Sequence, residues 1–319
     1  MNRFPNRRAF CFPGFPMAND PRNGMTASTW MLSGSLVFTF MGFFTTLLAD
    51  QVSWQIVALG RSGLAFSFSL VLALAAGARL VLHDSWFLWQ RSLAGSVSLV
   101  CTFHALTCLP LAEVLMVTNT FPVWLAMLSW PLLGEKPGWR VWVSALMGVA
   151  GVALVKQPWD NDGWSLDWLP LLTSLVAAWS TAFAMIGLNH LKHLDTRAVV
   201  VHFSAVSTLF ALAAFYWLPA RFAASQALEG NAPWLLLWVG ITATAGQICL
   251  TKAFTGGRAA VVAVLGLSQV LFGALLEGVW TGRWFDGLGW VGLGLVILST
   301  GWVLLHQARE KATLNAAKG

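Results

Sequence analysis

The chain has 319 residues, of which 57% are hydrophobic and only 10% are charged, and its formal net charge is +6. A soluble globular protein carries charge on about a quarter of its residues. This composition therefore excludes a soluble domain and indicates an outer surface that faces lipid.

Ten apolar segments follow one another along the chain, separated by short polar stretches. A hydrocarbon core about 30 Å thick requires roughly 20 apolar residues per helix, and no segment alternates as a barrel strand does. The expected spans are 28–49, 54–76, 91–108, 111–133, 139–156, 168–189, 197–218, 233–254, 259–280 and 288–307. The sequence predicts an all-α integral membrane protein with ten transmembrane helices.

The two ends of the chain are polar. We expect residues 1–27 to form a disordered basic tail and residues 308–319 to form a second tail, both cytoplasmic. Arg7 and Arg8 form a twin arginine, but prolines and polar residues follow it instead of an apolar segment, which argues against an export signal.

The basic residues predict the orientation of the helices. Most of the 19 Lys and Arg residues fall on the side of the N-terminus, among them Arg91, the first residue of the span 91–108. Lys156, Arg221 and Arg283 fall on the other side, and Arg61 falls within a helix. Because cytoplasmic loops retain Lys and Arg, we expect both termini in the cytoplasm, with the protein in the bacterial inner membrane.

The second half of the chain repeats the first. A shift of 148 residues aligns ALTCLPLAEVLMVTNTFPVWLAMLSWPLLGEK with AFTGGRAAVVAVLGLSQVLFGALLEGVWTGRW, so that Gly134 meets Gly282. Each half, 28–157 and 168–307, holds five helices, and an odd number forces the second copy to enter the membrane with opposite topology. Inverted repeats are typical of secondary transporters, which bind substrate near the bilayer midplane.

Several residues of the first half form a recognisable pattern: Arg61 in ALGRSGL, Pro122, Gly134 followed by Glu135, and Gly151. In these features the chain resembles the EamA-type family of the drug/metabolite transporter superfamily. The resemblance implies a ten-helix carrier that moves small metabolites, usually outward, by alternating access.

The cargo that the resemblance suggests first is an amino acid or a related amine, and sugars, nucleotide derivatives and drugs are the alternatives. The second half departs from the family pattern, because Ser268-Gln269-Val270 stands where a proline is expected and Gly282-Arg283 replaces Gly-Glu.

A polar band at the expected midplane is the first candidate for the substrate site. Asn119 and Thr120 lie near the centre of one helix, and Ser268 and Gln269 lie at the same depth in its counterpart. Polar groups at this depth are costly and usually face a cavity or another helix. Pro122 breaks the local backbone bonding, which indicates either a kink that contacts substrate or a kink that serves packing.

Two tryptophans and an arginine extend the candidate site. Trp124, and Trp179 beside Ser180, lie in mid-helix, where they form either an aromatic wall for substrate or ordinary packing. Arg61 lies about 10 Å below the outer surface. It binds an anionic substrate group, pairs with Glu113 or Glu277, or extends to the outer headgroups.

Three titratable residues are candidates for proton coupling, namely His104, Glu113 and Glu277. A carboxylate or imidazole in a low dielectric can titrate near neutral pH. Glu277 lies close to a helix end, so a solvated position is its alternative.

A membrane-embedded enzyme or lipid-handling protein is the alternative class. The segment HLKHLD, from His190 to Asp195, has the His-x4-Asp spacing of glycerolipid acyltransferases, but a loop location and the lack of a nearby third ligand favour a solvated loop. We expect no enzymatic activity, cofactor, metal or nucleic acid. The expected partners are a small-molecule substrate, the lipid bilayer and protons, with the protein a monomer or homodimer.

Overall fold

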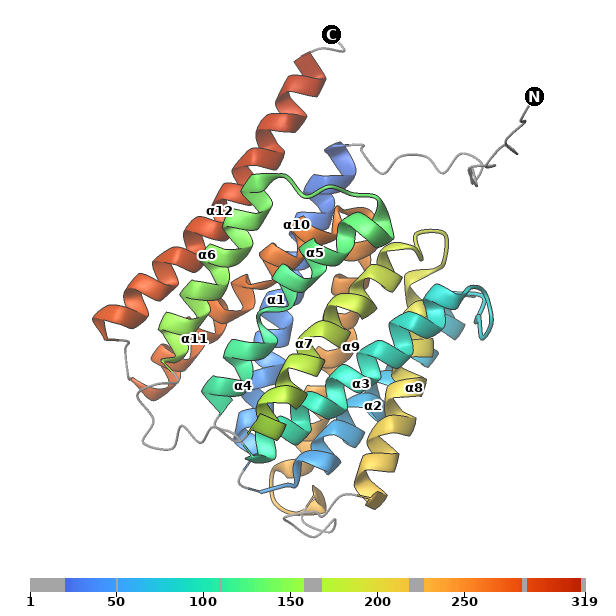
Figure 1. The fold of residues 1–319 in the computed structure, drawn as a ribbon. Coiled ribbons are helices and arrows are strands. Elements are labelled where there is room, and N and C mark those ends of the chain that lie inside the picture. The colour runs from blue at the N-terminus through green and yellow to red at the C-terminus, as the bar shows by residue number, and fades with distance from the viewer. Residues whose placement is uncertain are drawn as a thin grey trace, which may run out of the picture.

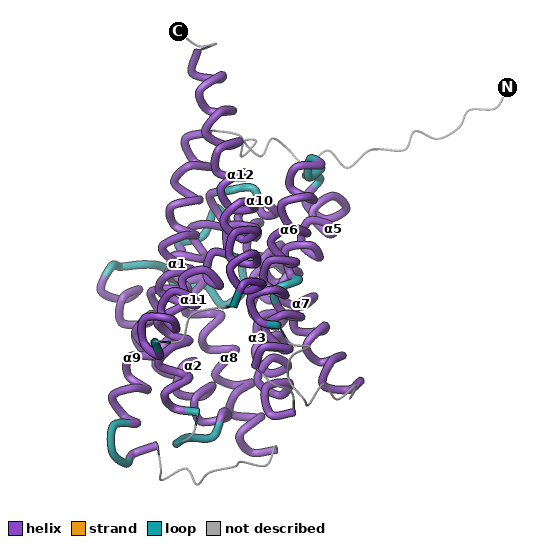
Figure 2. The backbone as a smooth tube through the Cα atoms, turned by 90° about the vertical axis from the view of Figure 1, so that its left-hand side faces the viewer, coloured by secondary structure: helices purple, strands orange, loops and turns teal. Residues whose placement is uncertain are grey.

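The computed structural model describes residues 21–49, 51–108, 111–157, 168–217, 227–282 and 286–316, and these ranges contain helices and no strand. The helices are α1 (Pro21–Leu48), α2 (Trp54–Ala75), α3 (Trp86–Cys108), α4 (Leu111–Thr118), α5 (Phe121–Leu133), α6 (Trp139–Lys156), α7 (Trp168–Asn189), α8 (Thr196–Trp217), α9 (Ala232–Gly256), α10 (Ala259–Gly266), α11 (Ser268–Thr281) and α12 (Gly287–Ala316). Figure 2 shows the tube as one bundle of helices.

Within the described ranges, eight helical segments are long and apolar enough to cross a membrane. Two of the eight are formed by pairs of consecutive helices, α4 with α5 and α10 with α11. The helix α6 is apolar but shorter over Trp139–Val155. The prediction of an all-helical, multi-pass membrane protein is confirmed at this level.

The observed ends of the spans differ from the predicted ones by more than two residues at three places. The helix α3 begins at Trp86 and not at residue 91, so Arg91 lies in its second turn and is buried, whereas it was expected at the cytoplasmic end of the helix. The helix α1 begins at Pro21, because proline suits the first turn of a helix. The helix α12 continues to Ala316, through most of the expected second tail, and residues 1–20 of the first tail lie outside the described residues.

Two helices are broken at the same place in the two halves. The helix α4 ends at Thr118 and α5 begins at Phe121, with Pro122 in its first turn, where the missing N–H leaves no bond unmade. Only Leu267 separates α10 from α11, and no proline is present there. The second break thus forms without the residue that explains the first.

Glycines end both broken helices in the same way. Gly134 after α5 has φ 67° and Gly282 after α11 has φ 68°. Only glycine adopts this left-handed conformation at no steric cost. The two residues matched by the 148-residue shift therefore cap equivalent helices.

The helices pack in pairs that join the two halves of the chain. The helix α1 packs along α9, α3 along α7, α2 along α8, and α6 along α12 at one edge of the bundle (Figure 1). The helices α6 and α12 approach closely, because Gly151 and Gly292 face each other. The helix α1 begins and α12 finishes at the same end of the bundle, which we call the termini end.

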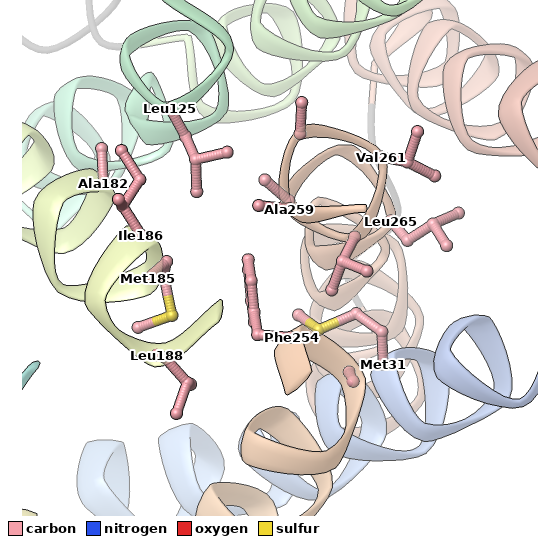
Figure 3. Packing of buried hydrophobic residues seen from close by; sticks show 14 of the residues in the cluster. Met31, Leu125, Ala182, Met185, Ile186, Leu188, Phe254, Ala259, Val261 and Leu265 are labelled. Carbon is pink, nitrogen blue, oxygen red and sulfur yellow. The ribbon is translucent and has the colours of Figure 1, made fainter. Parts of the chain in front are cut away.

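The main hydrophobic core fills the half of the bundle towards the termini end. It joins α5, α7, α9 and α10, and α1 contributes Met31 (Figure 3). We call it the closing cluster; among its members are Met31, Leu125, Ala182, Met185, Ile186, Leu188, Phe254, Ala259, Val261 and Leu265.

Candidate functional site

The break between α4 and α5 holds the first part of the predicted polar band. Asn119 Nδ2 donates a hydrogen bond to the carbonyl of Leu115 at 2.7 Å. Thr120 Oγ1 donates to the carbonyl of Val117 at 2.6 Å and accepts from Trp124 Nε1 at 3.1 Å. The preceding turn of α4 therefore satisfies much of the polarity of this break, and contact with substrate remains a prediction.

The break between α10 and α11 holds the second part of the band. Ser268 is buried, and its Oγ has no hydrogen-bond partner among the described residues. The side chain of Gln269 is exposed, and its backbone carbonyl accepts a hydrogen bond from Thr39 Oγ1 at 3.2 Å. Leu271 and Ala274 pack towards α6 and α12 on the opposite face of α11.

The two breaks lie side by side. A methyl group placed on Gly266, the last residue of α10, would stand 3.6 Å from the Phe121 ring at the start of α5. Pro122 is buried beside it, and Trp124 packs against the closing cluster. Pro122 and Trp124 thus have a packing role, and a role in substrate contact remains a prediction for both.

The remaining aromatic candidates lie on α7. Trp179 is 43% exposed and stacks on Phe183, with ring centroids 5.4 Å apart. Ser180, the next residue, is buried. The ring of Trp179 is therefore held by a neighbour four residues along its own helix.

Two of the three proton-coupling candidates have described side chains. His104 on α3 is half-buried, and Glu277 on α11 is exposed. The side chain of Glu113 lies outside the described residues. His104 and Glu277 thus lie on different helices and differ in exposure, and a role in proton coupling remains a prediction for both.

A buried arginine on α3 was missed by the sequence analysis. Arg91 is 2% exposed, its Nη2 donates a hydrogen bond to Gln247 Oε1 at 3.0 Å, and its guanidinium carbon lies 4.0 Å from the centroid of the Phe203 ring. Next to it, Ser92 Oγ lies 2.7 Å from His202 Nδ1. A polar cluster therefore joins α3, α8 and α9 in the bundle interior.

A carboxylate links the two halves of the chain at the termini end. Glu135, in the loop between α5 and α6, accepts a hydrogen bond from the backbone N–H of Ala259 at the start of α10. Burial raises the pKa of Glu135, and the charges of Arg258, Lys192 and His190 partly oppose this effect. Burial also lowers the pKa of Lys192.

A cavity of about 230 Å³ opens at the same end between α6, α10 and α12. Its lining includes Lys136, Arg140, Arg258 and the rings of Trp139 and Trp302. Basic and tryptophan side chains are typical of the membrane interface, so this cavity lies at the level expected for lipid headgroups and away from the polar band.

The histidines of HLKHLD contact structural neighbours. His193 Nε2 lies 2.7 Å from Asp84 Oδ2 in the loop between α2 and α3, and the His190 ring stacks on Phe87 with centroids 3.9 Å apart. Within the described ranges, no group of three or more His, Cys, Asp and Glu side chains could hold a metal ion.

Comparison of the sequence with known protein families gives one match. Residues 25–157 match the sequence model of the EamA-like transporter family. This part of the chain belongs to that family. The match covers Arg61, Pro122, Gly134 and Gly151, on which the resemblance was based.

Two curated relatives and one solved structure extend the EamA comparison over most of the chain. A pseudopaline exporter of Pseudomonas aeruginosa is 29% identical over 215 residues, which is 67% of this chain and 73% of that protein. A riboflavin transporter of Rhizobium johnstonii is 23% identical over 301 residues, 92% of this chain and 96% of that protein. A protein crystal structure superposes with a TM-score of 0.75 at 18% identity, covering 89% of this chain and 98% of the other.

The family match over residues 25–157, the relatives and the apolar helices together identify the chain as a membrane transporter. The named relatives carry different molecules, so the comparison leaves the cargo open. The crystal structure supports the fold alone, because its sequence identity is low.

Proposed function

We propose that the protein is a secondary carrier of small metabolites that works by alternating access, with ten membrane-crossing segments arranged as two inverted repeats, 28–157 and 168–307. The first repeat comprises α1 to α6 and the second α7 to α12, with each broken helix counted as one segment.

The observation that carries this proposal is that the main helix pairings stay the same when the two repeats are exchanged. The pair α1 with α9 corresponds to α7 with α3, and α1 with α10 and α11 corresponds to α7 with α4 and α5. The pairs α2 with α8 and α6 with α12 correspond to themselves. A two-fold relation between halves that hold five segments each supports the inverted arrangement.

The distribution of packing supports one closed and one open end. The closing cluster joins α5 to α10 in the half towards the termini end, and Glu135 bridges these helices at that end. In the described part of the chain, no hydrophobic cluster joins α4 to α11 in the other half. This is the asymmetry expected of a carrier whose site opens to one side at a time.

The charges support an orientation with both termini in the cytoplasm. The described loops and helix ends at the termini end carry the exposed or half-buried basic residues Arg79, Lys136, Arg140, Lys192, Arg197, Lys252 and Arg258. Retention of Lys and Arg on the cytoplasmic side then makes the closed end the cytoplasmic one, in a bacterial inner membrane.

The cargo that we propose first is an amino acid or related amine moved outward, with sugars, nucleotide derivatives and drugs as alternatives. The pseudopaline exporter supports the outward direction, and the riboflavin transporter supports a wider range of cargo. Coupling to protons through His104, Glu113 or Glu277 belongs to the same proposal.

Counterflow in proteoliposomes tests the function. Vesicles that contain the purified protein are loaded with one unlabelled metabolite and exposed to a trace of its labelled form. Accumulation of label without chemical change supports a carrier. If no metabolite in an amino acid, sugar, nucleotide and drug panel accumulates, the carrier proposal fails. Conversion to a product that depends on His190 or Asp195 would favour the membrane-embedded enzyme.

A further inference from the structure

Arg91 is a charged side chain buried without full compensation. It is among the largest fully buried side chains, and its only hydrogen bond among the described residues is that from Nη2 to Gln247. Its Nε has no partner among the described atoms. The Phe203 ring covers one face of the guanidinium and provides a cation–π contact, which does not satisfy the N–H groups.

A second arginine increases the positive charge at this place. Arg61 on α2 is half-buried. The helices that carry the cluster pack together, because α2 contacts α8 and α9, and α3 contacts α8. Two guanidinium groups therefore share one region of the bundle interior.

No described carboxylate neutralises this pair. The described acidic side chains lie in loops or on the surface, namely Asp84, Glu135, Asp195, Glu229, Glu277 and Asp286. Glu113, whose side chain is not described, belongs to α4, and α4 packs on α3, α6 and α7. A buried charge costs several kcal/mol unless an opposite charge or a set of hydrogen bonds compensates it.

We propose that Arg61 and Arg91, with the side-chain amide of Gln247, bind an oxyanion of the cargo, so that the transported molecule carries a carboxylate or phosphate. A guanidinium presents two parallel N–H donors that match the two oxygens of such a group. Gln247 accepts from Arg91 through Oε1 and keeps its NH₂ group as a further donor. This assignment rests on the carrier function proposed above and specifies the class of its substrate.

A purely structural role for Arg91 makes a different prediction. If Arg91 serves to hold α3 against α8 and α9, replacing it with glutamine removes contacts to Gln247 and Phe203 and lowers stability. If it is an anion site, Arg91→Gln removes an uncompensated buried charge. The unfolding temperature without added anion then stays the same or rises.

The test uses the purified full-length protein in detergent and measures thermal unfolding by tryptophan fluorescence. The probes are L-glutamate, citrate and inorganic phosphate, with glucose as the uncharged control and sodium chloride at matched ionic strength. We expect at least one oxyanion to raise the unfolding temperature of the unaltered protein, and glucose to have no effect. Stabilisation by the carboxylates alone or by phosphate alone identifies which oxyanion the cargo carries.

The variants locate the binding. Arg91→Gln and Arg61→Gln should each weaken the affinity for that anion at least about tenfold, because each removes charge-assisted hydrogen bonds. Arg91→Lys keeps the charge but loses the paired donors, so its affinity for the anion should fall between that of the unaltered protein and that of Arg91→Gln. Arg79→Gln, which makes the same charge change in an exposed loop, should leave the affinity unchanged.

The result that overturns the assignment is stabilisation by none of the three oxyanions, or equal stabilisation of Arg91→Gln and the unaltered protein. A lower unfolding temperature of Arg91→Gln without anion also contradicts it and favours the structural role. Counterflow separates this failure from that of the carrier. Flux of an uncharged metabolite supports the carrier function and refutes the anion site. Anion binding without flux of any metabolite supports the anion site and refutes the carrier function.

Discussion

The contact between α6 and α12 makes a quantitative prediction about stability. A Cβ atom added to Gly292 would stand 2.6 Å from the Gly151 carbonyl oxygen and 2.8 Å from the backbone nitrogen of Val155. These are backbone atoms, which cannot rotate away, so Gly292→Ala must push the two helices apart. Overpacking of this kind costs about 1–3 kcal/mol, and close approach at small residues is a main source of helix association in membranes.

The same helix provides a matched control. A Cβ atom added to Gly294 meets nothing within 4 Å, so Gly294→Ala should gain about 0.8–1.0 kcal/mol from the higher helix propensity of alanine. Gly292→Ala receives the same gain but pays for the clash, which leaves it less stable than Gly294→Ala by about 1–3 kcal/mol. The free energy of unfolding, measured by titration with SDS and read by tryptophan fluorescence, checks the difference. Equal stability of the two variants would refute the close contact of α6 with α12.

Three further predictions concern the closed end and the polar band. Asn189 Nδ2 donates to the carbonyls of Phe254 and Gly257 at 2.7 and 3.0 Å, so Asn189→Ala should lower the free energy of unfolding by about 1–3 kcal/mol, again measured by SDS titration. Because burial raises the pKa of Glu135, its protonated form favours the folded state. The stability that this group contributes is present below its ordinary pKa of 4.5 and is lost as pH rises through the raised pKa; Glu135→Gln should flatten that part of a pH–stability curve, and an unchanged curve would argue against a buried carboxylate. Asn119→Ala and Gln269→Ala should each lower counterflow with no loss of folded protein, and unaltered flux in both would remove the polar band from the site.

Regular features of the fold could be predicted from the sequence because they depend on local patterns. The apolar spans 139–156 and 168–189 coincide with α6 and α7, whose ends are marked by changes in composition. The 148-residue shift paired Gly134 with Gly282, and both adopt the left-handed conformation. Local composition and backbone sterics therefore fix these elements.

The polar interior could not be predicted, because it depends on which helices meet. Arg91 was expected at the cytoplasmic end of the span 91–108, whereas the helix begins at Trp86 and packs against α7 and α8, which places Arg91 inside the bundle. The sequence did contain a signal for this polar face. Four polar residues fall in consecutive helical turns that follow Trp86 and Trp89, namely Gln90, Arg91, Ser92 and Ser96. All four side chains are buried, which indicates a helix with a polar face inside the bundle.

The break in the second half was not predicted, because the span 259–280 was expected to be one continuous helix. Pro122 explains the end of α4, whereas Leu267 has no such property, and the break there coincides with its packing against Val152 and Val296 of α6 and α12. The helix break therefore coincides with tertiary contacts in the second half, whereas proline favours it in the first half.

Cysteine accessibility of the closing cluster tests alternating access most directly. Leu125 on α5 is fully buried in the closing cluster. In a variant whose four native cysteines are replaced, Leu125→Cys should resist a membrane-impermeant thiol reagent added at the termini end and should react when a substrate found by counterflow is present. Ala177→Cys, equally buried on α7 near Ser98 of α3, should stay protected throughout. Protection of Leu125→Cys under every condition, in protein that still exchanges substrate, would contradict a carrier that opens at this end.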